Sequence, residues 1–189
     1  GQQTTLPHYN SMGSDTVSNH TRRNSYTLPA LFVRYQPTDW LILRYASTNT
    51  LTGPNYSDII PLYNINGAAR AVEYRNPFLE PGLSDNRDYV VSINNKHLGL
   101  LSLSYFTKKI DGLIFSSGQR YITDPSLYGL PGFTETYRIN NYKANNPYEV
   151  VLDGFEIDYQ TRFWYLPELL RGLVFNANYT RTNSEVKYP

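Results

Sequence analysis

Several sequence features that would indicate a particular class of protein are missing from this chain. It contains no cysteine, which excludes disulfide bonds and thiolate metal sites within the chain. No apolar run approaches the ~18 residues that a transmembrane helix needs, so such a helix is excluded. No basic segment followed by an apolar core stands at Gly1, and a signal peptide is not expected in these residues. Charge is scarce too: 17% of residues are charged, and a net charge of +1 argues against a nucleic-acid-binding surface.

Tyrosine is abundant instead, with 18 residues among 189, and Asn, Ser and Thr are frequent. A chain of this length can form one domain with a hydrophobic core. Few charges combined with many tyrosines and small polar residues are typical of a β protein that contacts water on one side.

The clearest pattern is an alternation of apolar and polar residues between 152 and 182, which predicts strands with one face of each kind. The first arm has Phe155, Ile157, Tyr159 and Phe163 on one face, and Glu156, Asp158, Gln160 and Arg162 on the other. After a short turn over 166–172, the second arm has Leu173, Phe175, Ala177 and Tyr179 opposite Asn176, Asn178, Thr180 and Thr182. Each arm is about 10 residues long, which suits a tilted strand crossing a bilayer better than the ~5–6 of a soluble strand. Phe163, Trp164 and Tyr165 crowd the turn, as interfacial aromatic residues do.

Two further hairpins are predicted upstream, around short turns at 37–39 and 94–99. Long connections without periodicity separate the hairpins, over about 51–86 and 118–149, and residues 1–24 also have the composition of a loop. In an antiparallel meander, this order places all short turns at one rim and all long connections at the other. Outer-membrane barrels have this asymmetry, with short periplasmic turns and long extracellular loops. We therefore predict an all-β fold: about six antiparallel strands in three hairpins of a transmembrane β-barrel, with 1–24 as an extracellular loop.

Six strands are too few for a closed membrane barrel, whose smallest members have about eight. Open edges in lipid would leave backbone groups unpaired, at several kcal/mol each. The first and last strands are therefore expected to pair with strands outside these 189 residues.

A family resemblance supports this interpretation. Residues 76–81 read Asn-Pro-Phe-Leu-Glu-Pro and precede Ser84-Asp85-Asn86, which resembles the Asn-Pro-x-Leu-x-Pro-Glu stretch of TonB-dependent outer-membrane receptors. The segment 99–114 resembles the strand that follows in that family. Residues 154–160 with Leu166-Pro167, Gly172-Leu173 and Asn178-Tyr179-Thr180 are similar to its next hairpin. The resemblance covers about 27–189, and Gly82 departs from it where the family usually has an acidic residue.

The resemblance implies that residues 1–189 are part of a barrel domain of about 22 strands in the bacterial outer membrane, without the plug domain. It implies a transporter that takes up a scarce ligand: siderophore-bound iron, haem, cobalamin or an oligosaccharide. The implied partners are outer-membrane lipid, the rest of the barrel and the plug, and the TonB energy-coupling complex, which would act through the missing amino-terminal part.

Candidate sites are few. His8, His20 and His97 lack the spacing of metal ligands, and no catalytic constellation or cofactor motif is present, so neither an enzyme nor a bound cofactor is expected. Glu156 and Asp158 could be a glycosidase-like carboxylate pair, but polar residues facing a lumen are the simpler interpretation. The predicted lumen-facing residues are Arg34, Arg44, Glu156, Asp158 and Arg162, with ion pairs expected between the acids and the arginines. The candidate ligand contacts in the extracellular loops are Tyr56, Tyr63, Tyr121, Tyr128, Phe133 and Tyr137, although loops that pack on themselves would also use such residues.

Two alternatives remain from the sequence alone. One is a soluble, Tyr-rich antiparallel β module that binds glycans or proteins. The other is an outer-membrane enzyme, which no residue pattern supports.

Overall fold

The computed structural model describes residues 9–10, 14–15, 23–60, 63–66, 69–122, 136–140 and 142–189. The chain divides into two compact units. We call the first, made of 27–51, 83–111 and 147–189, the strand unit. The second, made of 1–26, 52–82 and 112–146, is the loop unit.

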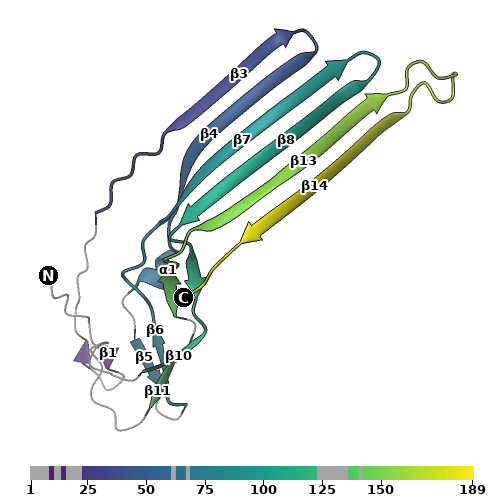
Figure 1. Cartoon of the computed structure of the whole chain (residues 1–189). Helices are drawn as coiled ribbons and strands as arrows, with labels where there is room; N and C mark the ends of the chain where they lie inside the picture. The colour runs from purple at the N-terminus through teal and green to yellow at the C-terminus, as the bar shows by residue number, and fades with distance from the viewer. Residues whose placement is uncertain are drawn as a thin grey trace. The chain divides into compact units, whose positions relative to one another are not determined.

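The strand unit is a six-stranded antiparallel sheet in which strands adjacent in the unit's sequence are also neighbours in space (Figure 1). Its strands are β3 (Ala30–Thr38), β4 (Leu41–Thr52), β7 (Gly82–Asn95), β8 (Gly99–Asp111), β13 (Val150–Arg162) and β14 (Val174–Glu185). They contain 9 to 14 residues, and the three hairpins predicted from the alternation are all present. Figure 1 shows the three short connections at the same end of the sheet.

The strand ends differ in detail from the prediction. Pro37 belongs to β3 rather than to the turn, because the β3–β4 register shifts between Tyr35 and Thr38 and the turn is formed by Asp39 and Trp40. Strand β7 begins at Gly82, six residues before the expected start at Asp88, because a polar stretch without alternation can still pair as a strand.

Glycine is required at two places in the sheet. Gly99 closes the β7–β8 turn with φ of +83°, and a Cβ there would collide with the Gln160 carbonyl oxygen. Gly154 lies under the Phe106 ring, whose Cζ would be 2.6 Å from an added Cβ. The Phe106 ring therefore occupies the space that a side chain at 154 would need.

The sheet is open, because β3 and β14 are its two edges. The expectation that the first and last strands do not pair with each other is therefore confirmed. The strand unit has the form of a barrel segment rather than of a closed barrel.

The loop unit contains regular structure where the sequence predicted irregular connections. Its elements are β1 (Tyr9–Asn10), β2 (Ser14–Asp15), α1 (Tyr56–Ile59), β5 (Tyr63–Asn66), β6 (Ala71–Tyr74), β9 (Ile114–Ser116), β10 (Gln119–Ile122), β11 (Tyr137–Asn140) and β12 (Lys143–Asn145). Four of them form a sheet in the order β10-β11-β6-β5, with β11 and β6 parallel. Val72 and Ile139, 0% and 2% exposed, are register partners at its centre. The prediction of irregular structure was wrong here, because strands of two to four residues are too short to show a period.

Candidate functional site

One face of the sheet in the strand unit is apolar. The strand registers, together with the contact between the Tyr45 and Tyr89 rings at 5.0 Å, place these side chains on a common face. We call this set the apolar face: Val33, Tyr35, Leu43, Tyr45, Tyr89, Val91, Ile93, Leu101, Leu103, Tyr105, Phe155, Ile157, Tyr159, Phe175, Ala177 and Tyr179. Its members remain accessible, for example Leu103 at 44% and Phe175 at 47%. A monomer in water rarely exposes a continuous apolar patch of this extent.

Aromatic residues border the apolar face at both ends of the strands. At one end, Tyr105 lies between its register partners Tyr89 and Phe155, and the next positions outward along the strands carry Arg87 and Asp153. At the other end, Trp40 and Phe163 to Tyr165 surround the short turns, and the Trp164 indole donates a hydrogen bond of 3.0 Å to the Lys96 carbonyl.

The height of the apolar face fits a bilayer. Eight residues separate Phe155 from Phe163, which is roughly 26 Å of extended strand at about 3.3 Å per residue. A tilt of about 40° reduces this to roughly 20 Å, close to the ~25 Å apolar band of outer-membrane barrels.

The opposite face, which we call the polar face, carries all five residues predicted to face a lumen: Arg34, Arg44, Glu156, Asp158 and Arg162. Small polar residues surround them, including Ser92 and Ser102, whose hydroxyl oxygens are 2.8 Å apart. Glu156 accepts a hydrogen bond of 2.7 Å from the Asn178 amide.

The ion pairs expected between acids and arginines on this face are not formed among the described residues. The ion pairs among the described residues join Arg75 to Glu73, Arg87 to Asp85 and Lys109 to Glu149 instead. Glu156 and Asp158 lie on β13, whereas Arg34 and Arg44 lie on β3 and β4 at the far end of the strand order, which the sequence pattern could not reveal.

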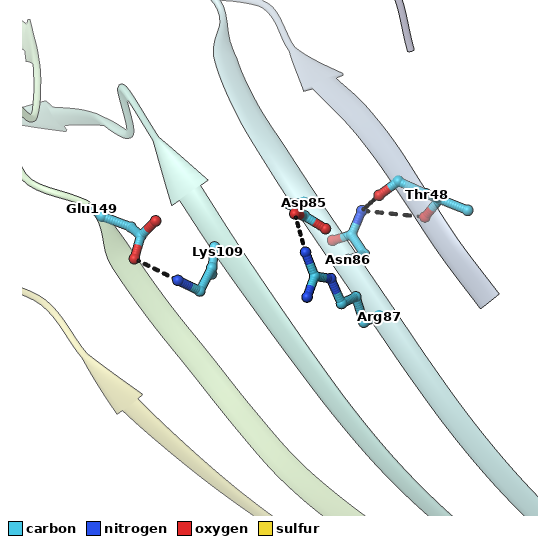
Figure 2. A network of polar contacts seen from close by, with 6 residues as sticks. All are labelled: Thr48, Asp85, Asn86, Arg87, Lys109 and Glu149. Atoms are coloured by element: carbon cyan, nitrogen blue, oxygen red, sulfur yellow. Dashed lines mark hydrogen bonds and ion pairs between the residues drawn. The ribbon is translucent and has the colours of Figure 1, made fainter. Parts of the chain in front are cut away.

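Polar contacts join the strands at the ends away from the short turns (Figure 2). Asn86 of β7 donates to the Thr48 carbonyl of β4 at 3.1 Å, while Lys109 contacts Glu149 at 3.2 Å. Arg87 contacts Asp85 at 3.1 Å on the same strand. Because both ion pairs are solvent-exposed, each contributes little to stability. They mark where the sheet changes from apolar to charged.

The Asn-Pro motif in the loop unit has a structural role. The Asn76 amide donates to the Lys143 carbonyl at 3.0 Å, and its oxygen accepts from the Phe78 amide at 3.0 Å. The Asn145 side chain accepts from the Glu80 amide and donates to the Glu80 and Gly112 carbonyls at 2.9, 2.7 and 2.8 Å. Two asparagines thus satisfy backbone groups that no regular ladder pairs, and they connect two segments far apart in sequence.

Comparisons with known proteins decide the family. Residues 5–189 match the family described as TonB dependent receptor-like, beta-barrel. The chain belongs to this family. The resemblance inferred from the motifs is confirmed, and the open antiparallel sheet is a segment of a TonB-dependent receptor barrel.

Solved structures agree on the fold. The siderophore receptor PirA of Pseudomonas aeruginosa matches with a TM-score of 0.58 and 16% identity, over 83% of this chain and 28% of that one. PirA of Acinetobacter baumannii matches with a TM-score of 0.51 and 18% identity, over 72% and 21%. The hemophore receptor HasR of Serratia marcescens, solved with its hemophore HasA and heme, matches with a TM-score of 0.56 and 18% identity, over 85% and 22%.

The chain therefore spans about a quarter of the length of these receptors. No curated protein sequence matches it. The loop unit of this TonB-dependent receptor segment carries the candidate ligand contacts.

Those candidate contacts are not brought together in the described residues. Tyr56, 87% exposed, begins α1, and Tyr121, 69% exposed, lies in β10. Tyr137 pairs with Ile122 in register and so lies on the opposite sheet face from Tyr121. Tyr63 is in β5. Tyr128 and Phe133 lie outside the described residues, and ligand contact by all six stays a prediction.

The parallel pairing of β6 with β11 was missed by the sequence analysis. It joins Arg138 to Ala71 in register, and the Arg138 amide donates to the Arg70 carbonyl at 3.0 Å. On the Tyr121 side of this sheet, Arg138 Nε and Asn140 Oδ1 are buried without a hydrogen-bond partner. Two four-residue strands about 65 residues apart leave no signal in the sequence that could have predicted this.

The described residues contain neither a metal-binding cluster nor a membrane-spanning helix. Across the ranges that the structure describes, no group of three or more His, Asp or Glu side chains could hold a metal ion. No helix in those ranges is long and apolar enough to cross a membrane. His97 packs against the Trp164 ring, with the centroids 5.6 Å apart.

Proposed function

We propose that the chain is part of an outer-membrane TonB-dependent receptor that takes up a scarce ligand actively. The observation that carries this proposal is the apolar face, exposed over six strands and bordered by aromatic residues at both ends. Lipid would cover such a face without any further protein layer. Membership of the TonB-dependent receptor family supports the same function.

The topology of the sheet supports an orientation. The short turns at Asp39, at 96–98 and at 163–173 lie at the same end of the strands and would be periplasmic. The connections over 53–81 and 112–149 leave from the opposite ends and would be extracellular, together with 1–24. The polar face, with Arg34, Arg44, Glu156, Asp158 and Arg162, would then line the lumen.

The ligand class follows from the family rather than from a site. Siderophore-bound iron, haem, cobalamin and oligosaccharides are the candidates, and tyrosines of the extracellular connections would contact them. Siderophores and haem should be tested first, because the structural neighbours are named as siderophore and hemophore receptors. Energy would come from the TonB complex through a plug domain outside these residues.

Deleting the complete gene from its host and measuring growth or uptake on each ligand class tests the proposal. We expect loss of uptake of one class, restored by the full-length gene and absent again in a host without TonB. Recovery of the wild-type protein in the soluble fraction would refute the proposal, as would unchanged uptake of all four classes.

A soluble binding module is disfavoured by the same apolar face. In water, this face would need a second layer, and the strand unit provides only one sheet among its described residues. The purified full-length protein should therefore require detergent.

A further inference from the structure

The four-stranded sheet of the loop unit has two unlike faces. Val72, Ile122 and Ile139 are 0%, 4% and 2% exposed, and the strand registers place all three on one face, which is the buried side of the sheet. The opposite face contains Tyr121, which is 69% exposed. We call this second set the Tyr121 face: Ala71, Glu73, Gln119, Tyr121, Arg138 and Asn140.

Two register pairs bring four polar side chains of the Tyr121 face together. Tyr121 is opposite Arg138, and Gln119 is opposite Asn140, so the Cβ atoms within each pair are about 4.5–5.5 Å apart. The two pairs are separated by two residues along the strands, which is about 6.6 Å at roughly 3.3 Å per residue. The parallel β6–β11 pairing adds Glu73 beside them, so both long connections contribute to this face.

Two polar atoms of the Tyr121 face have no partner. Nε of Arg138 and Oδ1 of Asn140 are buried and form no hydrogen bond. Buried polar atoms are nearly always paired, because leaving one unpaired is unfavourable. No hydrogen bond of either atom is lost when these side chains turn towards a bound molecule, and one hydroxyl group could accept from Nε and donate to Oδ1.

Charge and polarity restrict the class of that molecule. The charges of Arg138 and Glu73 balance, and Glu73 is also paired with Arg75 at 3.4 Å. An anionic iron complex would need several free cations, and haem would need apolar walls. Among the described side chains of the Tyr121 face, Arg138 is the single cation and Ala71 the single aliphatic residue. A neutral ligand rich in hydroxyl groups suits this face better.

We propose that the Tyr121 face binds a neutral oligosaccharide. The Tyr121 ring stacks on the C–H face of one sugar ring, because tyrosine combines a flat apolar surface with a polar end. Gln119, Arg138 and Asn140 bind the hydroxyl groups, since their amide and guanidinium groups supply both donors and acceptors.

This inference rests on the proposed function, which places both connections outside the cell and includes oligosaccharides among the ligand classes. It differs from the ligands named for the structural neighbours. Those receptors share 16–18% identity with this chain, so the likeness extends to the fold and does not select a ligand.

The test is calorimetric titration of the purified full-length receptor in a detergent without a sugar headgroup, which would otherwise compete. The neutral probes are maltoheptaose, cellohexaose, xylohexaose, mannohexaose and chitohexaose. Ferric enterobactin, ferrioxamine B, haemin and cyanocobalamin represent the other ligand classes. Y121A removes the ring and Y121F keeps it, whereas R138Q and N140A remove the polar groups. R120Q, exposed on the opposite face of the same sheet, is the matched control for losing an arginine.

We expect an oligosaccharide of this set to bind the wild type, and Y121A, R138Q and N140A each to weaken its binding about tenfold, which corresponds to about 1.4 kcal/mol. Y121F should stay within about twofold, because the stacking ring is kept. R120Q should match the wild type. Because Tyr121 is 69% exposed, its removal should leave the loop unit folded, and amide exchange of β10 and β11 measures this separately.

Three results would overturn the inference. Equal oligosaccharide binding by the wild type, Y121A and N140A, with unchanged amide exchange in β10 and β11, would place the sugar elsewhere. Binding of an iron complex, haemin or cyanocobalamin without any oligosaccharide would contradict the ligand class and leave the proposed function standing. Binding of none of the probes would contradict the site as well. The proposed function fails separately, if the wild-type receptor is not found in the outer membrane.

Discussion

Replacing Leu103 with arginine tests which face of the sheet contacts lipid. Leu103 lies in β8 between its register partners Val91 and Ile157, and Tyr105 marks the aromatic border two residues away. Its position is therefore inside the apolar face, two residues from one of its aromatic borders. An arginine near the bilayer midplane of a β-barrel costs about 2–4 kcal/mol, which falls to about 0–1 kcal/mol near the interfaces.

The neighbouring residue provides the matched control. Ser104 follows Leu103 on the same strand but points to the polar face, where Glu156 is its register partner. An arginine at 104 would lie in the lumen opposite a carboxylate, so its cost should stay below about 1 kcal/mol. The two substitutions add the same side chain one residue apart, and only the face differs.

A third substitution tests a position near the other aromatic border of the apolar face. Phe175 is also on the apolar face, but its register partner Thr161 is only two residues before Phe163 at the aromatic turn. Phe175→Arg should therefore cost about as much as Leu103→Arg, because each position lies two residues from an aromatic border, although the sequence alone suggested a mid-membrane position for Phe175.

The assay is reversible unfolding of the full-length receptor in lipid vesicles with a chemical denaturant, followed by tryptophan fluorescence. We expect a larger loss of unfolding free energy for Leu103→Arg and for Phe175→Arg than for Ser104→Arg. Equal losses at 103 and 104 would refute the assignment of faces. A harmless Leu103→Arg together with a damaging Ser104→Arg would reverse it.

Three further predictions concern topology, the loop unit and the open edges. Protease added to intact cells should cut within 1–24, 53–81 or 112–149 only, and cutting at 166–171 before permeabilisation would invert the topology. Asn145→Ala removes three hydrogen bonds and should destabilise the loop unit by about 1–3 kcal/mol, seen as faster amide exchange near Glu80, whereas Asn183→Ala, whose amide contacts Asp153 only at 3.5 Å, should have little effect. The 189-residue segment expressed alone should aggregate or stay unfolded in detergent, and a heat-resistant monomer would contradict the open sheet.

The six long strands were predictable because each repeats the same alternation several times. In β13, for example, Phe155 to Arg162 changes face at every residue, so a shift of one position would move every apolar side chain to the wrong face. A hydrophobic pattern of this length determines both the strand and its orientation in the sheet. The same argument explains why the start of β7 was missed: its first six residues, Gly82 to Arg87, contain a single apolar side chain and no alternation, and pairing rather than pattern makes them a strand.

The loop unit was not predictable for the opposite reason. Strands β6 and β11 have four residues each, and their pairing depends on contacts between segments about 65 residues apart. The central pair, Val72 and Ile139, looks like any other pair of aliphatic residues in the sequence. The Arg34–Arg44 juxtaposition was missed likewise, because it depends on the shifted register at the β3–β4 turn.

The two edges of the sheet lead to the same requirement. Strand β14 presents twelve residues at one edge, and about half of their backbone N–H and C=O groups point away from β13. In lipid, each unpaired group costs several kcal/mol, so this edge alone demands another strand. Strand β3 demands one at its own edge, and the side chains of that strand on the polar face would lie beside Phe32 and Arg34.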